Sequence, residues 1–114
     1  MSSCAIFTFP STGIYIVRAT LSAYRSADAR YVNLYIQATT NNSSYATIAQ
    51  SYDSIEQAES SSTYANLTTE SLIDVTDTSN VKVRFQLRAT QVVNIKASTD
   101  NNENSFTFIR LGDT

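Results

Sequence analysis

Strict alternation of apolar and polar residues is the feature that most constrains the fold of this chain. Between Val81 and Arg88, four apolar side chains alternate with four polar or charged ones, in the order Val-Lys-Val-Arg-Phe-Gln-Leu-Arg. A β-strand would direct the two sets to opposite faces of a sheet, whereas a helix would scatter the cations around its circumference. The segment from Tyr31 to Ala38 alternates in the same way. Both segments are therefore predicted to be strands that bury one face.

The same periodicity extends along the chain and predicts a single all-β domain over residues 1–114. Six further strands are predicted at about 5 to 9, 13 to 24, 45 to 52, 64 to 75, 91 to 97 and 105 to 111. Short strands separated by Ser, Thr, Asn and Asp turns favour an antiparallel jelly-roll sandwich. The predicted core contains Tyr15, Val17, Leu21, Val32, Leu34, Ile36, Val83, Phe85 and Leu87.

Two of these strands are apolar on both faces. Ile14 and Ile16 lie opposite the core row of the strand at 13–24, and Ile109 lies opposite two phenylalanines in the strand at 105–111. A strand that covers only its own core would carry polar residues on its outer face. Burial of the second face by self-association is therefore predicted, and the alternative is a third layer or a loop folded over the sheet.

The composition argues against an enzyme. The chain has no histidine, a single cysteine and two glycines, so it lacks the usual general base, the commonest metal ligand and a glycine-rich phosphate loop. Two carboxylate pairs would suit a glycosidase, Asp53 with Glu56 and Asp74 with Asp77. Both lie in or beside predicted turns, where solvated carboxylates are the simpler interpretation, and the oxygen-rich run 100–104 is a weak calcium candidate. We predict no catalytic activity, no cofactor and no metal.

Charge and hydropathy narrow the range of partners. Eight Lys and Arg against ten Asp and Glu give a net charge of −2, unlike the basic face of a nucleic-acid-binding protein. No apolar run approaches the roughly 20 residues of a membrane span, and the N-terminus lacks the pattern of a signal peptide. These patterns predict synthesis in the cytoplasm of the cell that makes the protein, with neither nucleic acid nor membrane as a partner.

One row of positive charge is a candidate for binding a partner. Lys82, Arg84 and Arg88 lie on the outward face of their predicted strand, with Lys96 as a further candidate. They are predicted to contact an anionic surface, and the alternative is that they only keep the sheet soluble. Tyrosine suits both protein interfaces and sugar-binding surfaces. The tyrosines expected to be most exposed are Tyr24, Tyr31, Tyr45 and Tyr52.

The order of motifs resembles a known family. The pattern Phe-x-x-Pro-x-x-Gly-x-Tyr, which begins at Phe7 and precedes a long strand, resembles the start of the third strand in tumour-necrosis-factor and C1q-like (TNF/C1q-like) trimeric jelly rolls. Leu-Ile-Asp-Val at 72–75, a turn, the alternating strand and a terminal aromatic strand follow in the same order. The closing Phe-Thr-Phe-Ile-Arg-Leu-Gly-Asp resembles, more particularly, the closing strands of virion structural proteins of tailed phages.

The resemblance implies a homotrimer in a virion, because such trimers turn their inner sheets towards a threefold axis. The predicted subunit interface contains Ile16, Tyr64, Phe108 and Ile109. The leading function is a non-enzymatic phage virion structural protein, a trimeric capsid decoration or cement protein that binds the major capsid protein or another virion protein. The alternative is the receptor-binding tip of a tail fibre that recognises a host surface glycan. Family members begin with a first strand pair that this sequence does not show, so either the inner sheet is short or a neighbouring subunit fills its edge.

Overall fold

The computed structural model of the chain describes residues 4–57, 61–95 and 104–114. These residues form eight strands and no helix, which confirms the predicted all-β class. The strands are β1 (Cys4–Thr8), β2 (Gly13–Arg25), β3 (Ala29–Thr39), β4 (Ala46–Ile55), β5 (Thr63–Val75), β6 (Lys82–Ala89), β7 (Asn94–Ile95) and β8 (Ser105–Gly112). Each predicted strand has a counterpart, but β7 is much shorter than the predicted strand at 91–97, whose last two residues lie outside the described residues.

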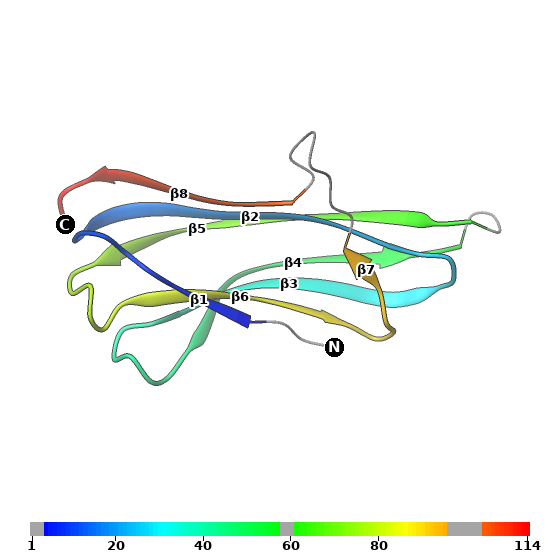
Figure 1. Cartoon of the computed structure of the whole chain (residues 1–114), viewed down its shortest axis with the longest axis horizontal. Helices are drawn as coiled ribbons and strands as arrows, with labels where there is room; N and C mark the ends of the chain where they lie inside the picture. The colour runs from blue at the N-terminus through cyan, green and yellow to red at the C-terminus, as the bar shows by residue number, and fades with distance from the viewer. Residues whose placement is uncertain (1–3, 58–60, 96–103) are drawn as a thin grey trace.

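The strands form two antiparallel sheets that pack face to face (Figure 1). Sheet A has the order β1-β6-β3-β4. In sheet B, the long strand β2 pairs with β5 along one edge and with β7 and β8 along the other. The protein is therefore a β-sandwich in which β2 is the central strand of sheet B.

The pairing of the strands is nested. β3 pairs with β4, β2 pairs with β5, and β1 pairs with β6. This is the pattern of one long antiparallel ribbon folded back on itself. The connection between β4 and β5 leads from the innermost pair, β3 with β4, to the next pair, β2 with β5. The pairs β3–β6 and β2–β8 then join segments of the ribbon side by side.

The core lies between the sheets, where the alternating apolar rows meet. All nine side chains predicted for the core are buried, which confirms the inward face assigned to β2, β3 and β6. In β2, each odd-numbered residue from Gly13 to Ala23 is buried, while the even-numbered side chains point outward. Burial of one Val, Leu or Ile side chain contributes roughly 1.5–3 kcal/mol. The buried rows of the two facing sheets are therefore the main source of the stability of the sandwich.

A tight turn joins β1 to β2 and lies against the end of β8. Gly13 has a φ of 151°, a conformation that side chains with a Cβ atom rarely adopt. A Cβ atom there would lie 2.6 Å from Nε of Arg110 and 2.7 Å from the carbonyl oxygen of Gly112. The Pro/Gly motif of the sequence therefore allows the first turn and the last strand to approach each other closely.

Candidate functional site

The outer face of sheet B carries an exposed apolar row. Ile16 on β2 lies between Leu72 on β5 and Ile109 on β8, each its direct partner in the pairing register. Leu72 is 62% exposed and Ile109 is 44% exposed. These three residues are named the outer apolar row. The structure therefore brings two of the predicted interface residues, Ile16 and Ile109, into contact range and adds Leu72, which the sequence reasoning missed.

From Arg18 to Ser22, the outward residues of β2 and their partners on β5 are polar and bonded to one another. Thr20 faces Thr68, with hydroxyl oxygens 3.5 Å apart, and the Ser22 hydroxyl donates to Oδ1 of Asn66 at 2.8 Å. Between these pairs and the outer apolar row lies an exposed ion pair, in which the guanidinium of Arg18 binds the Glu70 carboxylate at 2.7 Å. On this side of the outer apolar row, the face therefore offers hydroxyls, an amide and a neutralised charge pair, whereas Ile14 and the exposed Asp74 lie on the other side.

Tyr64, the third predicted interface residue, lies far from the outer apolar row. It is 56% exposed and packs against Tyr24, with ring centroids 5.7 Å apart. Tyr24 is eight residues along β2 from Ile16, which corresponds to about 26 Å in a strand. A single small contact patch cannot include both Tyr64 and the outer apolar row.

Phe108, the fourth predicted interface residue, lies on the opposite face of β8 from Ile109. Its ring points between the sheets, 5.4 Å from Phe7, 5.7 Å from Phe9 and 6.1 Å from Phe85, measured between centroids. Neighbouring residues of a strand alternate between faces, so Phe108 and Ile109 do not face the same surface. The alternation of the sequence predicts Ile109 opposite the phenylalanines of this strand, yet the predicted interface contains both Phe108 and Ile109.

The predicted cation row lies on the outer face of sheet A. Lys82, Arg84 and Arg88 all project from the same side of β6, away from the core. Nζ of Lys82 donates to Oδ1 of Asn42 at 2.6 Å, and Nε of Arg84 donates to Oε1 of Gln37 at 2.7 Å. Among the described residues, no ion pair involves these three cations. Neutral partners therefore hold two of them in place and leave their charge uncompensated.

Tyrosines and amides surround the cation row. The Arg84 guanidinium stacks 4.2 Å from the ring centroid of Tyr45, the Asn33 amide donates to the Tyr35 hydroxyl at 3.0 Å, and the Tyr52 hydroxyl donates to Gln50 at 2.7 Å. As predicted, Tyr31 and Tyr52 are exposed, whereas Tyr24 and Tyr45 are half-buried by their aromatic and cationic neighbours. The outer face of sheet A is a connected polar and aromatic surface.

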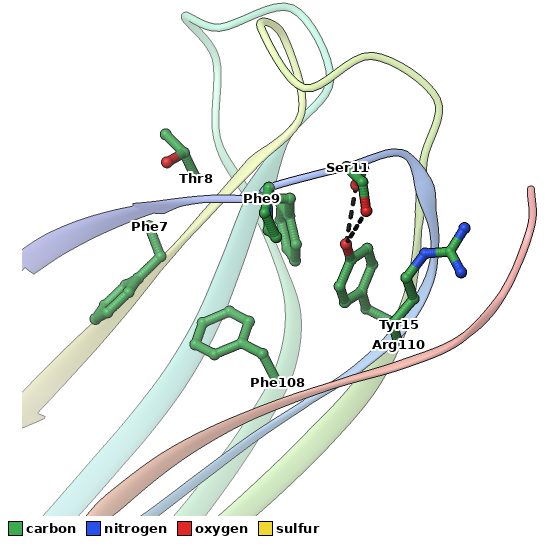
Figure 2. A pocket seen from close by; sticks show the side chains of 8 residues that line it. Phe7, Thr8, Phe9, Ser11, Tyr15, Phe108 and Arg110 are labelled. Atoms are coloured by element: carbon green, nitrogen blue, oxygen red, sulfur yellow. Dashed lines mark hydrogen bonds between the residues drawn. The ribbon is translucent and has the colours of Figure 1, made fainter.

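A third feature lies where the sandwich is open, between the edges of β1 and β8. An aromatic slot of about 380 Å³ is lined by Phe7, Phe9, Tyr15, Phe108 and Arg110, together with Thr8, Pro10 and Ser11 (Figure 2). The Tyr15 hydroxyl donates to the carbonyl oxygen of Ser11 at 2.9 Å, and the Arg110 guanidinium donates to the carbonyl oxygen of Thr12 at 3.1 Å. The slot is therefore apolar, with its polar groups gathered at the turn between β1 and β2.

All five phenylalanines of the chain gather around this opening. Phe85 stacks on Phe106 at 4.4 Å and meets Phe7 edge to face at 5.3 Å, and the remaining two are those already described in the slot. Phe106 is nevertheless 42% exposed. The sequence reasoning missed this convergence. The only signal for it was that four of the five phenylalanines lie within a few residues of one end of the chain or the other.

Of the carboxylates considered for glycosidase chemistry, Asp77 bonds within the turn before β6, whereas Asp53 lies in β4 and Asp74 in β5. Asp77 accepts from the Ser79 amide at 2.7 Å and from the Asn80 side chain at 3.1 Å, while Asp53 accepts from the Ser54 amide at 2.8 Å. The described residues contain no cluster of His, Cys, Asp and Glu that could hold a metal, and no helix long and apolar enough to cross a membrane. Most of the calcium candidate, residues 100–103, and Lys96 lie outside the described residues.

The three surfaces favour different partners. The outer apolar row suits a dry protein contact, the outer face of sheet A suits an anionic or polyhydroxylated surface, and the slot suits apolar side chains. No protein-family model and no curated protein matches this chain, so its function has to be inferred from these surfaces.

Proposed function

We propose that this protein is a non-enzymatic structural protein of a phage virion, a trimeric decoration or cement protein on the outside of the capsid. The observation that carries the proposal is the outer apolar row, which crosses three adjacent strands of sheet B beside a stretch of paired polar residues. Self-association would remove these side chains from water, at roughly 25 cal/mol for each Å² of apolar surface buried. The row is thus the proposed centre of the subunit interface.

A jelly roll accounts for the strand orders. In that fold a long antiparallel ribbon rolls up into two four-stranded sheets, and nested pairing is the mark of such a ribbon. The pairs β3–β4, β2–β5 and β1–β6 are three successive steps along it, and β8 lies beside β2 where the last strand of the ribbon belongs. The resemblance of the motifs to TNF/C1q-like trimers supports this fold and, with it, threefold assembly.

The outer face of sheet A supplies the proposed attachment to the particle. Lys82, Arg84 and Arg88 present three charges without a carboxylate partner among the described residues. Because neutral neighbours already hold Lys82 and Arg84, less side-chain entropy is lost when they bind an acidic surface. The resemblance of the closing strand to those of tailed-phage virion proteins favours the major capsid protein, or another virion protein, as that surface.

The oligomeric state tests the proposal. Light scattering of the purified protein at micromolar concentration is expected to give the mass of a trimer. Leu72→Asp should shift the protein to monomer, because a charge in the outer apolar row would be buried without a partner. Thr68→Asp is the matched control, since it lies on the same strand and face but outside the row, and it should remain trimeric. A stable monomer of the unmodified protein would contradict the proposal.

A second function, the tip of a tail fibre that binds a host glycan, is favoured by the tyrosines of sheet A. Tyr52 is 61% exposed, and its hydroxyl is held by Gln50, so an apolar ring with a fixed polar edge is available to a sugar. The test is binding to immobilised lipopolysaccharide by wild type, Tyr52→Ala and Tyr64→Ala. Loss in Tyr52→Ala alone would favour the fibre tip, because Tyr64 is similarly exposed but lies on the other sheet. Equal binding by all three would exclude this role for the face.

A further inference from the structure

We propose that the open edge of β8 accepts an extended strand from another polypeptide chain. That strand would pair antiparallel with β8 and place apolar side chains, at alternate positions, in the aromatic slot between β8 and β1. The site differs from both outer faces described above, so this proposal stands independently of the proposed trimer contact and of attachment through sheet A.

The nested pairing identifies what the edge lacks. β1, β2 and β3 each have a ribbon partner, which is β6, β5 and β4 respectively. Among the described strands, β8 pairs only with β2, and that pair is one of the lateral contacts between segments of the ribbon. The regular continuation of the ribbon is therefore one more strand on the free side of β8. Since every pair of described strands in both sheets is antiparallel, the added strand would be antiparallel as well.

The sequence of β8 leaves this edge open to pairing. Edge strands are usually protected by charges, prolines or bulges. The stretch Ser105–Ile109 contains neither a charge nor a proline, and its pairing register with β2 is regular. The irregularity and Arg110 come only afterwards, opposite the start of β2. The free row of backbone groups is thus available along most of β8.

The slot has the shape and chemistry that side chains of an added strand require. It opens between β1 and β8, where such a strand would run, and Phe7 of β1, Phe9 just after β1 and Phe108 of β8 converge on it (Figure 2). Phe106, next along the inner face of β8, remains 42% exposed although its ring stacks on the core residue Phe85. One row of apolar side chains from the added strand would cover Phe106 and fill the slot, and would complete the aromatic cluster.

These features also define the chemistry of the strand. Its inward positions are apolar because they meet phenylalanine rings, and its outward positions next to Ser105 and Thr107 are polar because that part of the outer face carries hydroxyls. A small apolar ligand would fill the slot but would leave the backbone groups of β8 unpaired. Pairing and filling together favour a strand, the mode of recognition called β-augmentation.

Synthetic peptides as long as β8, which has eight residues, test the proposal on the full chain. The probe alternates valine and threonine; one control has the same composition with the valines grouped in one half, and another has alternate backbone nitrogens methylated. By fluorescence anisotropy, the probe is expected to bind at least about tenfold more tightly than either control. Equal binding of the probe and the methylated peptide, or binding of none of the peptides at millimolar concentration, would overturn the proposal.

Two variants of β8 locate the site. Phe106→Ser should weaken binding of the probe by about tenfold, whereas Ile109→Ser, which changes a similarly exposed residue on the opposite face, should not. Circular dichroism establishes that both variants are folded, and the methylated peptide tests the site without any change to the protein. Loss of binding in Ile109→Ser alone would place the peptide on the outer face and refute the proposal. Light scattering on the same variants tests the proposed trimer separately from peptide binding. Ile109→Ser should disrupt the trimer, and Phe106→Ser should leave it intact.

Discussion

The outer faces of the two sheets share one core but differ in how their polar groups are arranged. On sheet A, uncompensated cations are held by amides and a tyrosine ring. On sheet B, Arg18 and Glu70 form a closed ion pair on one side of the outer apolar row, and the exposed Asp74 lies on its other side. A face with a central apolar row and few unpaired charges favours contact with a similar surface, whereas a face with a row of cations favours a partner of opposite sign. The difference supports the proposed self-association through sheet B and the proposed attachment through sheet A.

The largest expected effect concerns the core on which both faces depend. Phe85→Ala removes a buried ring that contacts Phe7, Phe106 and Phe108, and it should lower the free energy of unfolding by about 3–5 kcal/mol. Urea denaturation followed by circular dichroism measures the loss. Gln86→Ala, the next residue on the outer face, should cost less than about 1 kcal/mol. A loss below about 1 kcal/mol for Phe85→Ala would mean that this cluster contributes little to folding.

The second largest effect is expected on binding to particles, when the charges on the outer face of sheet A are reversed. Reversal of Lys82, Arg84 and Arg88 to Glu should weaken binding to purified particles by about tenfold or more, and the residual binding should be less sensitive to salt. The trimer should persist, because these residues lie on sheet A. Sedimentation of particles with bound protein, at several salt concentrations, gives both quantities.

A matched control tests whether position or total charge matters. The Lys82→Gln, Arg84→Gln, Arg88→Gln variant lowers the net charge by three, and so does a variant with Glu on the outer face of sheet B at Thr20, Asn66 and Thr68. Only the variant of sheet A should bind particles less well. Normal binding of the sheet A variant to particles would show that the cation row is only a solvated surface.

The smallest expected effect tests whether the ion pair on sheet B is structural. Both partners are about half exposed, and such pairs contribute between zero and about 1 kcal/mol. Glu70→Gln should therefore change the free energy of unfolding by no more than about 1 kcal/mol and leave the trimer unchanged. A larger loss of stability, or dissociation, would show that the interface extends past the outer apolar row to Arg18.

The parts of the structure that depend on local alternation were predictable, and those that depend on register were not. Alternation of apolar and polar residues identified β6 and the inward row of β2, because a strand with one buried face produces this alternation whatever its neighbours are. The distance between Tyr64 and Ile16 depends on how β5 aligns with β2, and the convergence of Phe7 with Phe108 depends on which strands form edges. The extent of β7 was overestimated because Val92 and Val93 continue an apolar pattern without pairing.

The nested ribbon also has a consequence for the order of folding. β3 and β4 are joined by a short loop, but β8 must find β2 across almost the whole chain, with Gly112 opposite Ile14. Contacts between such distant residues close large loops and form slowly. During synthesis β8 is also the last of these eight strands to leave the ribosome. We therefore expect the edge of β2 that pairs with β8 to stay exposed until β8 docks. At that step, a newly made chain either pairs its own β8 with β2 or pairs with a neighbouring copy.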